Sequence, residues 1–144
     1  MNELHEAQLW LDRANDTLFA SDFNLKNELT LAAVNRAYYS MFYCTTLLLR
    51  TEGIITKSHS GTLNKFGELF IKTNRIDTRY SSMLRKAFDF RQSCDYDIEV
   101  TLSDEDAKLL VSYATEFTNS VSIILNRLRS HLKINNLNSP KSVN

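Results

Sequence analysis

One stretch of the sequence decides the fold class: residues 27–51 read NELTLAAVNRAYYSMFYCTTLLLRT and contain neither glycine nor proline. Apolar side chains recur there every three or four residues, which is the spacing of an α-helix. They occupy most of the helix circumference, so we expect this helix to lie at the centre of the protein with other helices around it. Gly53 follows the stretch and is a natural helix terminator.

Helical spacing continues on both sides of this central segment. The N-terminal stripe, which predicts a helix over 2–22, consists of Leu4, Ala7, Leu11, Ala14 and Leu18. Three further helices are predicted over 61–73, from 78 to about 94 and over 104–130, with a loop over 95–101. Ser60 and Asp77 are the expected N-caps of the first two. The predicted fold is therefore all-α: an antiparallel, up-and-down four-helix bundle with one additional short helix.

Composition limits the class of protein further. The chain has 144 residues with only three glycines and one proline, too few turn residues for an all-β fold. We expect one domain over 1–132 and a disordered tail over 133–144, which is rich in Asn and Ser. Two cysteines and three scattered histidines predict no metal site, and no cofactor is expected. The charged N-terminus and the short apolar runs predict a cytoplasmic protein without membrane contact.

Charge is balanced overall but separated along the chain. Seventeen basic and seventeen acidic residues leave no net charge, which by itself points to no partner. Residues 57–91 carry eight basic and three acidic side chains, whereas 95–106 carry six acidic and no basic ones. One interpretation is a basic surface for phosphate groups beside an acidic loop. The other is a pair of solvated helix faces with nearby counter-charges, and spacing alone favours neither.

Two groups of polar residues interrupt the apolar pattern. Arg36 shares a face of the central helix with two tyrosines, either in a cleft or with its stem over apolar surface. Arg91 and Asp95 are four residues apart, which predicts an ion pair on one helix face. Tyr96 is five residues from Arg91, about 140° around an ideal helix. The two side chains therefore meet only if the helix ends there or if a second chain brings Tyr96 in.

Four sequence motifs occur in a defined order along the chain. They are Asn35–Phe42 (NRAYYSMF), Ser58–Gly61 (SHSG), Phe66–Phe70 (FGELF) and Arg91–Tyr96 (RQSCDY). In this order they resemble the HEPN (higher eukaryotes and prokaryotes nucleotide-binding) domain family, especially its small stand-alone bacterial and archaeal members. The resemblance covers residues 2–130 and implies an antiparallel helical bundle.

The resemblance also implies a link to RNA or nucleotides. Many HEPN proteins are metal-independent endoribonucleases that work as dimers, with a signature arginine followed four to six residues later by a histidine. Some are toxins paired with a minimal nucleotidyltransferase antitoxin. Arg91 matches the signature arginine, but Tyr96 stands five residues on, and no histidine occurs between His59 and His131. The sequence thus departs from the family pattern at the second signature position.

Chemistry assigns different roles to the residues of these motifs. Arg91, a candidate catalytic residue, suits phosphate binding because a guanidinium stays charged and grips phosphate with two N–H groups. Tyr96, the second candidate, is a poor base at neutral pH but can orient a phosphate, donate a proton or stack on a base. Asp95 is suited to holding Arg91 or Arg36 in position. His59 either titrates in the site or caps and braces the start of the helix that follows it.

Two functions remain open on this basis. The first is an RNA-directed HEPN protein, acting as the toxin ribonuclease of a toxin–antitoxin pair. The second is a non-catalytic module that binds a nucleotide, RNA or a nucleotidyltransferase, with Tyr96 marking the loss of cleavage. A purely structural dimerisation bundle is a third interpretation. We expect a homodimer in the first two cases because the central helix has excess apolar surface and a tyrosine-rich second face.

Overall fold

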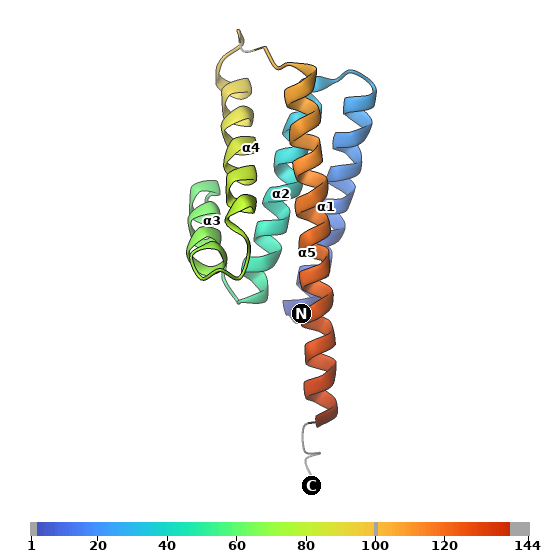
Figure 1. Cartoon of the computed structure of the whole chain (residues 1–144), viewed down its shortest axis with the longest axis vertical. Coiled ribbons are helices and arrows are strands. Elements are labelled where there is room, and N and C mark those ends of the chain that lie inside the picture. The colour runs from blue at the N-terminus through green and yellow to red at the C-terminus, as the bar shows by residue number, and fades with distance from the viewer. Residues whose placement is uncertain (1–2, 100, 139–144) are drawn as a thin grey trace.

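The computed structural model describes residues 3–99 and 101–138, and every regular element in this part of the chain is helical. The elements are α1 (Glu3–Lys26), α2 (Thr30–Thr51), α3 (His59–Phe66), the π-helical turn η1 (Gly67–Ile71), α4 (Thr78–Tyr96) and α5 (Asp104–Asn138). The four long helices run side by side and antiparallel, while α3 and η1 lie beside the first turns of α4 (Figure 1). The predicted all-α bundle with an additional short helix is confirmed.

Helix α2 is central, as its apolar circumference predicts. It contacts α1, α3, α4 and α5, and it contributes Tyr38, Met41 and Leu48 to the core with no exposed surface. Alanines 7, 14, 33 and 37 are also fully buried, and such small side chains let α1 and α2 approach closely. The hydroxyl of Ser21 donates a 2.7 Å hydrogen bond to the Ala33 carbonyl across this contact, so its polar group is satisfied inside the core.

The N-cap of α3 differs from the expected one. The backbone of Ser58 is extended, with φ −141°, and its hydroxyl accepts a hydrogen bond of 2.9 Å from the Gly61 backbone N–H. The helix therefore begins at His59, two residues before the predicted start after Ser60. Both serines are suitable N-caps by residue type. Because Ser58 is the N-cap, His59 lies in the first turn of α3.

The C-terminal helix is longer than predicted. Helix α5 continues to Asn138, whereas the sequence predicted a helix to 130 and a disordered tail from 133. The Asn-rich composition suggested disorder, but 133–138 contain no glycine or proline to end the helix. Residues 139–144 of the predicted tail lie outside the described part of the chain. Helix α1 likewise runs to Lys26 rather than 22.

Two properties of the described residues bear on function. No helix among them combines the length and apolar character that crossing a membrane requires. They also contain no cluster of three or more His, Cys, Asp or Glu side chains suited to holding a metal ion.

Candidate functional site

The packing of α4 against α2 places Arg91 over two aromatic rings. Its guanidinium carbon lies 5.4 Å from the ring centre of Tyr38 and 5.3 Å from that of Tyr39. Only 22% of the Arg91 side chain is exposed. Cation–π contacts of this kind attract the guanidinium and fix its position, and partial burial strengthens any ion pair that it makes.

The predicted ion pair between Arg91 and Asp95 is present. Arg91 Nε lies 3.1 Å from Asp95 Oδ2, with the carboxylate side chain 42% exposed. Arg91 Nε is buried and makes no hydrogen bond among the described residues, so this contact is an ion pair only. Any further anion would have to bind the terminal N–H groups at the exposed end of the guanidinium.

His59 reaches the same aromatic rings from the start of α3. Its Nδ1 shares a 2.7 Å hydrogen bond with the Tyr38 hydroxyl, and its ring stacks on Phe42 at 4.3 Å between ring centres. Burial, and secondarily the charge of Arg91, lowers the pKa of His59 below its ordinary value. The imidazole is consequently neutral near pH 7, the form that accepts a proton. His59 both braces the start of α3 and belongs to the cluster around Arg91.

Arg36 adds a second cation to this cluster. Its guanidinium carbon lies 5.1 Å from the ring centre of Tyr39, the same ring that Arg91 covers. The side-chain oxygen of Asn35 accepts two hydrogen bonds from Arg36, at 2.8 and 3.2 Å. Within the described part of the chain, Arg36 makes no ion pair. Two arginines over one ring, with one carboxylate nearby, leave the cluster with an excess of positive charge.

Tyr96 does not join the cluster. It is the last residue of α4, 85% exposed, and it lies on a different face of that helix from Arg91. The helix continues to Tyr96 instead of ending before it, so the chain does not fold the phenol back onto the guanidinium. The structure thus groups Arg91, Asp95, Arg36 and His59, and leaves Tyr96 apart.

Sequence reasoning missed the two aromatic residues that hold the site together. Tyr38 is completely buried, and Phe42 stacks against both its ring and that of His59. Burial raises the pKa of Tyr38 far above its usual range, so its hydroxyl stays protonated. The available signal was the phenol itself, because a tyrosine in a buried apolar stripe needs a hydrogen-bond partner.

A cleft of about 260 Å³ opens beside His59. Phe42 and Trp10 supply aromatic surface to it, and Lys57 and Arg50 supply positive charge. Arg50 is already paired with Glu6, whereas no ion pair engages Lys57 among the described residues. Aromatic surface with adjacent cations suits a nucleobase and its phosphate.

The tyrosine-rich face of α2 is half-buried within the chain. Trp10 of α1 packs on Tyr43 with 5.8 Å between ring centres, and Arg50 pairs with Glu6 of α1. Tyr39 is in edge-on contact with His59.

The lowered pKa of His59 predicts a pH dependence of stability. Because the unfolded chain binds a proton more readily than the folded one, stability falls as the pH drops below about 6.5 and is unaffected above it. His59→Gln removes this contribution while keeping a group that can hydrogen-bond Tyr38. We expect the urea midpoint of the native protein to fall more than that of the variant between about pH 8 and about pH 5.5. Equal falls in both proteins would contradict the lowered pKa.

The fold is a helical bundle that gathers two arginines and a neutral histidine on aromatic rings, and the chemistry of these groups suits phosphate. The chain belongs to the HEPN domain family, whose pattern matches residues 7–124.

Similar proteins occur in archaea and bacteria. The chain is 38% identical over 114 residues to the protein named "Putative toxin MJ0142" of Methanocaldococcus jannaschii, covering 79% of this chain and 78% of that protein. It is 31% identical to a UPF0332 protein of Thermotoga maritima, covering 90% and 98% of the two chains. A second protein of Methanocaldococcus jannaschii, named "Putative toxin MJ0605", is 28% identical over 85% of this chain and 91% of its own length.

Proposed function

We propose that this chain is a toxin-like, RNA-directed HEPN protein that cleaves RNA without a metal ion, with Arg91 binding the phosphate that is attacked. The carrying observation is the Arg91 guanidinium, which is held on two aromatic rings with about a fifth of its side chain exposed (22%). A phosphate oxygen would bind its terminal N–H groups. Arg36, over the same tyrosine ring, would bind a second oxygen or the next phosphate.

The chemistry of RNA makes a metal ion unnecessary. The 2′-oxygen attacks the adjacent phosphorus, the bond to the 5′-oxygen breaks, and a 2′,3′-cyclic phosphate forms. A base must take the 2′-hydroxyl proton, an acid must give a proton to the 5′-oxygen, and cations must stabilise the charged phosphate. His59 supplies the base in its neutral form, and Arg91 supplies the charge. In this proposal His59 acts as the base. The family signature places a histidine for this kind of role at the position where this chain has Tyr96.

Two further observations support an RNA substrate. The basic segment 57–91 ends at Arg91, so positive charge extends from the cluster along α3 and α4. The aromatic cleft beside His59 would receive a base next to the bound phosphate. Two relatives carry the word toxin in their names, which agrees with the toxin-like part of the proposal.

A second candidate function is a binding module without cleavage. It is favoured by the position of Tyr96, which is exposed on another face of α4 and leaves the acid role for the 5′-oxygen unfilled within the chain. Such a module would bind RNA or a nucleotide at Arg91 and Arg36, or a minimal nucleotidyltransferase as its antitoxin partner. Only a measurement of turnover separates it from the first function.

Arg91→Ala tests the proposal directly. We expect cleavage of a mixed single-stranded RNA pool, in the presence of EDTA, to fall about 100-fold or more, because the phosphate loses its buried cation. The matched control is Arg85→Ala, an exposed arginine about 120° away around the same helix that stacks on Phe88. Helical circular dichroism should be unchanged in both variants.

The outcomes distinguish the two candidate functions. No cleavage by the native protein, with RNA binding that Arg91→Ala weakens and Arg85→Ala does not, establishes the binding module. Equal losses in both variants would show that general positive charge, rather than the cluster around Arg91, binds RNA.

A further inference from the structure

A pocket apart from the candidate site lies between α5 and the connection that joins η1 to α4. Its volume is about 240 Å³, and its lining comes from residues 75–77 of the connection, from Tyr80 of α4 and from the part of α5 between residues 117 and 127. Neither Arg91 nor any residue of the cluster around it lines this pocket. A ligand bound there would leave that cluster free to bind phosphate, so the pocket can serve a function other than the proposed cleavage of RNA.

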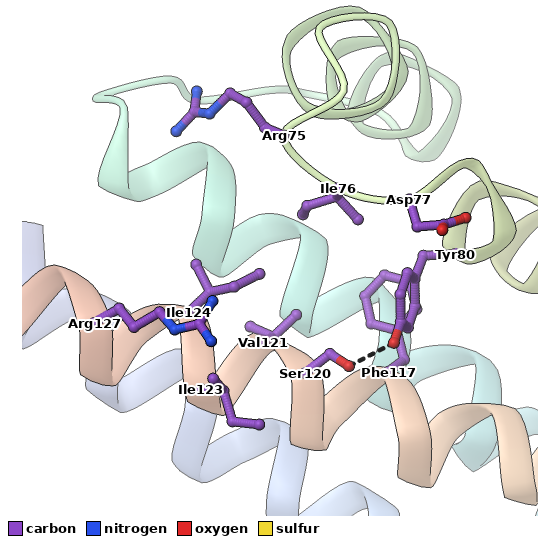
Figure 2. A pocket seen from close by; sticks show the side chains of 10 residues that line it. All are labelled: Arg75, Ile76, Asp77, Tyr80, Phe117, Ser120, Val121, Ile123, Ile124 and Arg127. Carbon is purple, nitrogen blue, oxygen red and sulfur yellow. Dashed lines mark hydrogen bonds between the residues drawn. The ribbon is translucent and has the colours of Figure 1, made fainter.

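The two ends of the pocket differ in chemistry. Figure 2 shows Arg75 and Arg127 at one end, and Tyr80, Ser120 and Asp77 at the other. At the second end, the hydroxyls of Tyr80 and Ser120 share a hydrogen bond of 2.6 Å (Figure 2), and Asp77 caps α4 by accepting a 2.8 Å hydrogen bond from a backbone N–H. The polar groups at this end already have partners within the chain. The arginine end is therefore the end that can bind the polar group of a ligand.

The walls between these ends are apolar. They are formed by Ile76, Phe117, Val121, Ile123 and Ile124. Ile76 and Ile124 are only half-buried, so an apolar ligand between them would remove further apolar surface from water. Because one water molecule takes up about 30 Å³ in the liquid, the pocket has room for about eight groups of the size of water or methylene.

The charges at the arginine end suit a ligand with a single negative charge. Arg75 is held in place, with its Nη2 2.6 Å from Glu52 Oε1 and its guanidinium carbon 4.4 Å from the ring centre of Phe70. Arg127 is exposed and makes no ion pair within residues 3–99 and 101–138. Arg75, Glu52 and Arg127 together carry one positive charge, which one carboxylate neutralises. The carboxylate of Asp77 at the opposite end repels an anion and thereby sets the orientation of the ligand.

We propose that this pocket binds a small carboxylate with an apolar body of up to about eight carbons. The ligand carboxylate accepts hydrogen bonds from Arg127 and from the N–H groups of Arg75 that Glu52 does not engage. The apolar body lies between Ile76 and Ile124 and ends at the pair of hydroxyls. Medium-chain fatty acids have this chemistry. Because such a ligand contacts both α5 and the connection that precedes α4, its binding stabilises the folded chain.

The dependence of affinity on chain length tests the apolar part of the proposal. By titration calorimetry, we expect binding to tighten about fourfold for each CH₂ group added from butyrate to octanoate, because each group leaves water. Decanoate should bind no more than about twofold tighter than octanoate, since its extra carbons extend beyond the pocket into water. Octan-1-ol, which lacks the charge, should bind at least about tenfold more weakly than octanoate. Affinity that rises by the same factor through decanoate, or equal affinities for octanoate and octan-1-ol, would contradict the proposal.

Arg127→Gln tests the contact with the carboxylate. The affinity for octanoate should fall about tenfold, because charge-assisted hydrogen bonds are lost, while the affinity for octan-1-ol stays unchanged. Lys133→Gln is the matched control, because it removes an exposed cation from another face of α5 and should leave the affinity for octanoate unchanged. Both variants should keep the helical circular dichroism of the native protein. Equal losses in the two variants would show that the net charge of the chain, rather than this pocket, attracts the carboxylate.

Methyl NMR of isoleucine-labelled protein locates the bound ligand. Octanoate should shift the signals of Ile76 and Ile124 and leave those of Ile55 and Ile98, which are 69% and 101% exposed and lie outside the pocket. Shifts of equal size at all four residues would mean adsorption to exposed apolar side chains and would overturn the proposal, as would the absence of octanoate binding. If Arg127→Gln weakens RNA binding and leaves octanoate binding unchanged, Arg127 belongs to an RNA surface and the proposal is wrong.

Discussion

His59→Gln is expected to lower RNA cleavage by about 100-fold or more while leaving RNA binding almost unchanged. Glutamine keeps a hydrogen-bonding group near the Tyr38 hydroxyl, so the contact between α2 and α3 is retained. It cannot take a proton from the 2′-hydroxyl. The variant thus separates binding at Arg91, which it leaves intact, from proton transfer, which it removes.

The expected effect rests on where His59 lies. Its ring is stacked on Phe42 and hydrogen-bonded to Tyr38, and the charge of Arg91 helps to keep it neutral. A neutral imidazole beside a phosphate-binding arginine is the pairing that general-base catalysis requires. Cleavage by the native protein should therefore decline only at a pH more acidic than the ordinary histidine pKa of about 6.5, since the pKa of His59 is lowered and the protonated form cannot act as a base.

The measurement is the cleavage rate of a fluorescent single-stranded RNA across this pH range, with binding measured in parallel. His5→Gln, which changes an exposed histidine of α1, is the matched control and should cleave at the native rate. In His59→Gln the residual rate should lose its decline at low pH. An unchanged rate in His59→Gln would remove His59 from the mechanism and leave it as the brace of α3.

The sequence predicted the contact within one helix but not the contacts between helices. The Arg91–Asp95 pair was predictable because residues four apart always share a helix face. The contact of His59 with Tyr38 joins residues 21 positions apart, and it depends on how α3 packs across α2. Spacing along one helix carries no information on such contacts. The motif order selected His59, but only the packing shows which atoms it meets.

The sequence likewise predicted some features of the fold and not others. Apolar spacing predicted the central position of α2, because a helix that is apolar around most of its surface must be covered on all sides. It did not predict the length of α5, because residues 130–138 are exposed and none of them belongs to the buried core. Leu132, Ile134 and Leu137 are exposed, so their pattern resembles that of a tail. The α3 cap was also undetermined, since Ser58 and Ser60 have the same capping chemistry.

Phe117→Ala is expected to destabilise the protein by about 3–5 kcal/mol, the largest effect on stability that we predict. Phe117 is 1% exposed, and its ring lies 6.0 Å from that of Phe66 in α3 and 5.6 Å from that of Tyr80 in α4. Truncation removes both ring contacts and leaves a cavity at the point where α3, α4 and α5 meet. Urea unfolding followed by circular dichroism measures the loss.

Phe19→Ala is the matched control, because Phe19 is 73% exposed and its removal should change stability by no more than about 0.5 kcal/mol. Phe117→Ala should affect the candidate site as well as the stability of the core. Phe117 joins the end of α3 to the start of α4, the two helices that carry His59 and Arg91, so Phe117→Ala should reduce cleavage even where the variant is still folded. Native stability in Phe117→Ala would mean that α3 and α4 are held against the bundle by α2 alone. In that case the positions of His59 and Arg91 would be set by Tyr38 and Tyr39, the two rings of α2 that both residues contact.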